Sequence, residues 1–148
     1  MSADSTAETI KRAEPQSLRA RSLSASITAN DLARSLTWYV DVVGFTIEEK
    51  YEHEGRVVGA SLKAGDIGIT INQDDGAKGL DRVKGQGISL YITTVQNVDE
   101  IAKQIQARGG VLESGPVDTE WGARLFSLRD PDNFRLAIMS EIANEGRE

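Results

Sequence analysis

The amino-acid sequence repeats one order of expected elements twice, and this repeat limits the possible folds more than any other feature. In each half, an alternating strand leads into a helix that begins at a capping residue and ends at glycine, and three further strands follow. Asp31 and Gly44 bound the first expected helix, Asn97 and Gly110 bound the second, and both pairs have the same separation. The expected strands cover 23–30, 46–51, 57–63 and 67–72 in the first half, and 88–93, 111–113, 124–129 and 134–139 in the second. The sequence therefore predicts a duplicated βαβββ protein of the α+β class.

The duplication also sets the expected domain boundaries. A first module covers 22–72, a second covers 88–140, and the aperiodic segment 73–87 between them is expected to be a long linker or a lid. Residues 1–21 are expected to form a flexible N-terminal arm, or an arm that packs on a partner subunit, and 141–148 a C-terminal tail. One helix per module covers one face of each sheet and leaves polar residues on the other. Two such polar faces opposite each other would enclose a concave trough of mixed β-sheet suited to a small molecule.

Composition excludes several functional classes. Lys and Arg number 17 against 23 Asp and Glu, and the resulting net charge of -6 argues against a nucleic-acid partner. The absence of cysteine excludes disulfides, thiolate metal sites and cysteine nucleophiles. No stretch is apolar enough for a membrane span, and the first residues contain no signal-peptide core, so a cytoplasmic location is expected.

The two ends of the duplicated region carry a family resemblance. The opening ITANDLARSLTWYVDVVGF and the closing WGARLFSLRDPDNFRLAI resemble the vicinal oxygen chelate superfamily, which contains glyoxalases, extradiol dioxygenases, fosfomycin-resistance transferases and bleomycin-resistance proteins. The resemblance covers 23–140 and implies a glyoxalase-like fold. Catalytic members hold one divalent metal with histidine and glutamate at four strand positions.

Those four metal-ligand positions are occupied by other residue types in this sequence. They fall on Ser24, on Thr70 or Asn72, on Gly87 or Ile88, and on Ala137. Hydroxyl, amide and methyl groups do not replace imidazole and carboxylate as ligands of Zn, Fe or Mn. The one histidine, His53, lies in a polar turn and is expected to face solvent. We therefore expect neither a metal nor another cofactor.

The closing TEWGARLFSLRDP is most similar to the bleomycin-resistance type, whose members bind a drug without altering it. This resemblance implies a homodimer with ligand grooves between subunits. The sequence departs from the pattern at Asn133, where the family has glycine, and at Leu125, where it has an acidic residue. The favoured interpretation is a protein that sequesters an antibiotic-like or aromatic ligand without turnover. The alternatives are a lyase, isomerase or dioxygenase with shifted metal ligands or a metal-free mechanism, and a plain interaction module.

Candidate ligand-binding residues come from the polar strand faces and from one loop. Trp121 is a candidate stacking surface, or else a cover over the core edge. Arg124 and Arg135 are candidates for binding a ligand carboxylate or phosphate, although Arg124 also has Asp118 and Glu120 as nearby partners. The acidic residues Asp74 and Asp75 could attract a cation, although most such runs are solvated turns. The remaining candidates are Ser24, Ser26, Thr70, Asn72, Ser89 and Tyr91.

Overall fold

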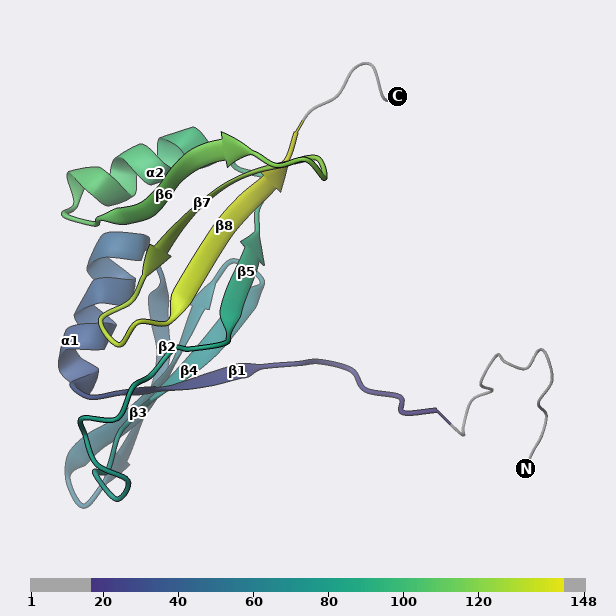
Figure 1. Cartoon of the computed structure of the whole chain (residues 1–148). Helices are drawn as coiled ribbons and strands as arrows, with labels where there is room; N and C mark the ends of the chain where they lie inside the picture. Colours follow the sequence, from purple (N-terminus) through teal and green to yellow (C-terminus); the bar gives the residue numbers. More distant parts are fainter. Residues whose placement is uncertain (1–16, 143–148) are drawn as a thin grey trace.

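A computed structural model describes residues 17–142. Two four-stranded mixed sheets carry the fold, and α1 and α2 lie along the same side of the molecule (Figure 1). The first module contains β1 (Ala25–Ala29), α1 (Leu32–Thr37), η1 (Trp38–Val43), β2 (Thr46–His53), β3 (Arg56–Ala64) and β4 (Ile67–Gln73). The second contains β5 (Ser89–Thr93), α2 (Val98–Ala107), β6 (Leu112–Asp118), β7 (Ala123–Arg129) and β8 (Arg135–Glu141).

Both sheets have the same topology, which confirms the predicted duplication and the α+β class. The strand orders are β1-β4-β3-β2 and β5-β8-β7-β6. In each sheet the first strand of the module pairs parallel with the last, and the other neighbours are antiparallel. The expected arm and tail fall largely on residues 1–16 and 143–148, which lie outside the described part of the chain.

The helix signals in the sequence have the expected geometry. The Asp31 carboxylate accepts a hydrogen bond from the backbone N–H of Arg34 at 3.1 Å, and the Asn97 side chain accepts one from Glu100 at 3.0 Å. The first helix continues as the wider π-helical turn η1 and ends at Gly44, whose φ of 113° is left-handed. Both predicted helices are therefore confirmed.

Strand β6 is longer than the sequence indicated. The prediction ended at Glu113, whereas β6 continues through Gly115 and Pro116 to Asp118. β6 is the outer strand of its sheet, where proline can be accommodated because one row of backbone N–H groups has no strand partner. The pairing of β6 with β7 has two register shifts, one between Leu112 and Ser114 and one between Ser114 and Val117.

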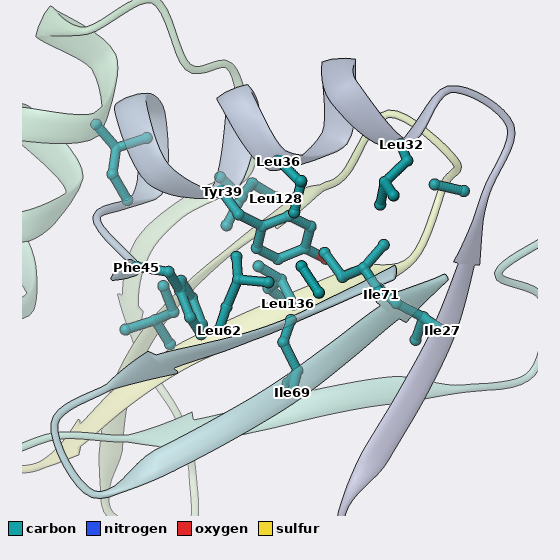
Figure 2. Packing of buried hydrophobic residues seen from close by; sticks show 14 of the residues in the cluster. Ile27, Leu32, Leu36, Tyr39, Phe45, Leu62, Ile69, Ile71, Leu128 and Leu136 are labelled. Carbon is teal, nitrogen blue, oxygen red and sulfur yellow. The ribbon is translucent and has the colours of Figure 1, made fainter. Parts of the chain in front are cut away.

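One hydrophobic core joins the two modules. Tyr39 from η1 lies between Leu62 of the first sheet and Leu128 and Leu136 of the second (Figure 2). Tyr39 is 0% exposed and packs edge-to-face against Phe45, with ring centroids 5.5 Å apart. The helix-facing sides of both sheets thus bury their apolar residues in a shared interior.

Polar contacts reinforce the same junction at the turn between β7 and β8. The Tyr39 hydroxyl donates to Asp130 at 2.7 Å, and Asp132 accepts from the backbone N–H of Asn30 and the hydroxyl of Ser35. Asn133 occupies this turn with φ of 76°, a conformation that asparagine tolerates better than most residues. The turn therefore fastens the second module to the first helix.

Candidate functional site: the two outer sheet faces

We call the side of each sheet that is turned away from the shared core its outer face. On the first sheet, Ile27, Ile69 and Ile71 point into the core. Because side chains alternate along a strand, the neighbouring residues lie on the outer face, and these are Ser26, Thr70 and Asn72. The Asn72 amide donates to the Ser26 hydroxyl at 3.0 Å. Ser26 and Thr70 are direct register partners. The structure therefore brings three of the predicted candidates together.

A hollow of about 400 Å³ extends from this first outer face. Ser24 precedes β1 and lines the hollow together with Thr70, Ser61 and Glu48. At the other side of the face, Gly59 lies under Asn72, and a Cβ added there would come within 2.7 Å of the Asn72 side-chain oxygen. Glycine at this position thus lets Asn72 lie flat across the sheet.

The second outer face carries Ser89, Tyr91 and Arg135 from the predicted set. Tyr91 is 59% exposed, and the Arg135 guanidinium donates to the Ser89 hydroxyl at 3.2 Å. Beside Tyr91 and further along β7 and β8 lies a small apolar cluster that is separate from the main core. It comprises Ala123, Leu125, Ala137 and Met139. This face is therefore part polar and part apolar, whereas the predicted ligand-binding residues on it were polar or aromatic.

Glu113 forms the centre of a charged network at one end of the second outer face. Its carboxylate accepts hydrogen bonds from Arg129 Nε at 2.8 Å, from Arg135 Nε at 3.2 Å and from the buried hydroxyl of Ser127 at 3.1 Å. The hydrogen bond from Arg129 is the largest of the effects that lower the pKa of Glu113. Glu113 and Arg129 were not among the predicted site residues, because their proximity depends on an irregular strand register.

The structure does not bring Arg124 together with the other candidate residues. Arg124 lies on the same face of β7 as Phe126 and Leu128, the face turned toward the helices. Its guanidinium binds Asp99 at 2.8 Å and Asp118 at 2.7 Å. The hydrogen bond to Asp99 is the largest cause that raises the pKa of Arg124. Of the two interpretations of Arg124, the pairing with Asp118 is the one whose contact the structure contains.

Trp121 occupies the tip of the β6–β7 hairpin. The indole is 62% exposed, and the turn is closed by a backbone hydrogen bond from Thr119 to Ala123 at 2.7 Å. Trp121 is thus a solvent-facing aromatic side chain next to the strand that carries Ala123 and Leu125.

Asp74 in the acidic turn is buried and paired, so its carboxylate is unavailable to a cationic ligand. Its side chain is 2% exposed and forms ion pairs with Lys84 at 2.9 Å and Arg82 at 3.2 Å. The backbone N–H of Gly76 and the Lys84 side chain lower the pKa of Asp74 to about 2. Lys84 also donates to Asn30 at 2.6 Å. These contacts attach the connector to the first module.

The residues at the implied metal position do not fit a metal. Thr70 and Asn72 present a hydroxyl and an amide, Ala137 presents a methyl group, and Asn72 already donates to Ser26. His53 is solvent-exposed, as expected, and lies 3.7 Å from the Glu54 carboxylate. Within residues 17–142, no three histidine or acidic side chains gather in a way that could hold a metal ion. We derive no chemical step through a metal.

The sequence matches the family model of the Glyoxalase/Bleomycin resistance protein/Dioxygenase superfamily over residues 21–138. The chain belongs to this superfamily. TioX from Micromonospora sp. ML1 has a similar structure, with a TM-score of 0.67 and 18% identity over 83% of this chain and 100% of that chain. A glyoxalase/bleomycin resistance protein/dioxygenase from Nocardioides has a TM-score of 0.67 and 16% identity, over 93% of this chain and 91% of that chain. At these identities, the superfamily structures support the fold and leave the ligand open.

A third similar structure is TnmS3, an antibiotic binding protein from Streptomyces sp. CB03234. Its TM-score is 0.65 at 20% identity, over 83% of this chain and 97% of that chain. A search of curated proteins finds no match. In the described residues, no helix has the length and apolar character needed to cross a membrane.

Proposed function

We propose that this superfamily member binds an antibiotic-like or aromatic small molecule reversibly and without metal-dependent turnover. The observation that carries the proposal is the pair of outer faces, which combine hydrogen-bonding side chains with exposed aromatic groups. Ser26 and Asn72 provide the polar part on one sheet, while Tyr91 and Trp121 provide exposed rings on or beside the other. Such a mixture of apolar surface and a few polar groups is typical of small-molecule sites. The similarity to TnmS3, an antibiotic binding protein, supports the same assignment.

The proposal includes a homodimer. The helix-facing sides of both sheets share one core, so the two outer faces point away from it. A second copy that lays its first outer face opposite the second outer face of this chain would enclose a groove on each side of the dimer. Strand β2 is exposed along its whole length, and the β2–β3 hairpin leaves Ile47, Tyr51, Val57 and Val58 partly uncovered. Exposed apolar groups on one hairpin favour a protein partner there.

The binding proposal is tested by tryptophan fluorescence with a panel of antibiotics and planar aromatic compounds. We expect a saturable change in the wild type and in Trp38→Phe, and its loss in Trp121→Phe. Trp38 is the matched control because it is half-buried against the core in η1. Sedimentation is expected to give a dimer. A panel without any saturable change, or stoichiometric metal after incubation with Zn, Fe, Mn or Ni, would contradict the proposal.

A further inference from the structure

Two arginines lie side by side on the second outer face. Arg129 on β7 and Arg135 on β8 are direct register partners on antiparallel strands. Like charges in this arrangement repel each other and destabilise a sheet. The pair is held by a single carboxylate, that of Glu113, which accepts from the Nε atom of each arginine. Two positive charges against one negative charge leave this cluster with a net charge of +1, on a chain whose net charge is -6.

Each guanidinium retains hydrogen-bonding capacity. Arg129 uses Nε for Glu113 and Nη1 for the backbone carbonyl of Asn133, and Arg135 uses Nε for Glu113 and Nη1 for Ser89. Within residues 17–142, neither Nη2 atom donates to another group. Guanidinium groups fixed by other contacts are suited to an oxyanion, because little side-chain freedom remains to be lost on binding.

The arginine pair lies beside open space. A hollow of about 700 Å³ is lined by Arg129, Ser89, Asn133 and the segment 85–88. Arg135 does not line the hollow, but its guanidinium donates to Ser89, which does, so a ligand in the hollow contacts Arg129 and lies next to Arg135. The side-chain exposure of 36% for Arg129 and 25% for Arg135 leaves both groups accessible.

An apolar surface begins next to the charged cluster. Ala137 is two residues along β8 from Arg135, about 7 Å away at the usual rise of a strand. Ala137 is itself buried, and the accessible apolar groups are Tyr91, its register partner on β5, and Val117 on β6, which are 59% and 50% exposed. Val117 pairs with Leu125, about 13 Å along the sheet from the arginine pair. The face therefore changes from cationic to apolar over the length of a small aromatic molecule.

We propose that the ligand of the second outer face carries an oxyanion, a carboxylate or a phosphate, which Arg129 and Arg135 bind together. Its apolar or aromatic body lies against the exposed side chains of Tyr91 and Val117, which are the register partners of the buried Ala137 and Leu125. The proposal rests on the proposed small-molecule function and specifies the ligand class. Glu113 has two effects in this site, since it positions both guanidinium groups and competes with the incoming anion for them.

The test uses four compounds that share a naphthalene ring and differ in charge. They are 1-naphthoate, 1-naphthyl phosphate, 1-naphthamide and 1-naphthylmethylamine, titrated calorimetrically into the full-length protein. We expect the two anions to bind at least tenfold more tightly than the amide and the amine. The tighter of the two anions identifies the oxyanion class. This comparison requires no variant, so it remains valid even if a substitution impairs folding.

Variants then locate the binding site. Arg135→Gln and Arg129→Gln are expected to weaken binding of the tighter anion at least tenfold, while Arg124→Gln leaves it unchanged. Arg124 is the matched control because it lies on the same strand as Arg129 and faces the helix side. Glu113→Gln is expected to strengthen anion binding, because the competing charge is removed. Unfolding curves of all variants verify that they are folded.

Equal binding of amide and anions, preference for the amine, or an Arg135→Gln variant that binds anions like the wild type would overturn the inference. These results differ from a failure of the proposed function. Anion binding that depends on Arg135, in a protein that binds no compound of the antibiotic panel, would support the arginine site and contradict the sequestering function. Panel compounds that bind without dependence on Arg129 or Arg135 would support the function and contradict the arginine site.

Discussion

Replacement of Tyr39 by phenylalanine tests how the two modules are held together. The substitution removes only the hydroxyl, which donates to Asp130 Oδ2 at 2.7 Å from a fully buried ring. The other oxygen, Asp130 Oδ1, keeps its hydrogen bonds from the backbone N–H groups of Asp132 and Phe134. A buried hydrogen bond to a charged group contributes about 1.5–3 kcal/mol. We therefore expect Tyr39→Phe to lower the free energy of unfolding at neutral pH by about 2 kcal/mol.

The pH dependence of this loss has a definite sign. Burial raises the pKa of Asp130, while the Tyr39 hydroxyl lowers it, so the variant raises this pKa further. A carboxyl group whose pKa is higher in the folded state stabilises the protein most below its unfolded pKa, and that contribution is lost as the pH rises through the folded pKa. In the variant, ionised Asp130 keeps a buried negative charge that has lost the hydrogen bond from Tyr39, whereas protonated Asp130 carries no charge. The destabilisation by Tyr39→Phe is therefore expected to be smaller at about pH 4 than at neutral pH.

Denaturant unfolding at fixed protein concentration measures both effects. Tyr51→Phe is the matched control, because Tyr51 is 40% exposed on β2. The free energy of unfolding of this variant is expected to differ from that of the wild type by less than about 0.5 kcal/mol. A Tyr39→Phe protein as stable as the wild type, or a loss of equal size at both pH values, would refute the reasoning.

Three further substitutions test the connector and the core. Gly85 and Gly87 both have positive φ, but a Cβ at Gly85 would collide with the Asn133 carbonyl, whereas Gly87 has open space. Gly87→Ala is expected to cost about 1 kcal/mol and Gly85→Ala clearly more, as measured by denaturant unfolding, and equal losses would argue against the close contact. Leu62→Ala is expected to cost about 2–5 kcal/mol with an unchanged denaturant slope, because Leu62 is fully buried in the shared core. A loss below about 1 kcal/mol would contradict its place there.

The repeat and the helix ends could be predicted from the sequence because they depend on local signals. Asp31 and Asn97 begin their helices by accepting hydrogen bonds from groups three residues away, and Gly44 supplies a left-handed end. The end of β6 could not be predicted in this way. Gly115 and Pro116 usually break a strand, and only the outer position of β6 in its sheet makes them tolerable.

The candidate site was less predictable because it depends on which face each strand residue occupies. Leu125, Phe126 and Leu128 are all apolar, so the alternation along β7 is ambiguous, and the sequence alone did not decide which sheet face Arg124 occupies. Glu113, Arg129 and Arg135 come from three different strands, β6, β7 and β8, and the contact of Glu113 with the arginines depends on a register shift between β6 and β7. No local pattern contains that information.

The shared core has a consequence for how the repeat can be divided. Each half of the chain contains a complete set of strands and a helix, yet neither half contains all the residues that bury Tyr39. A fragment that ends at the connector would leave Tyr39 without Leu128, Leu136 and the Asp130 carboxylate. The repeating unit of the sequence is therefore smaller than the cooperative unit of folding. Unfolding of the intact chain should take place in one transition, with no stage at which one module stands alone.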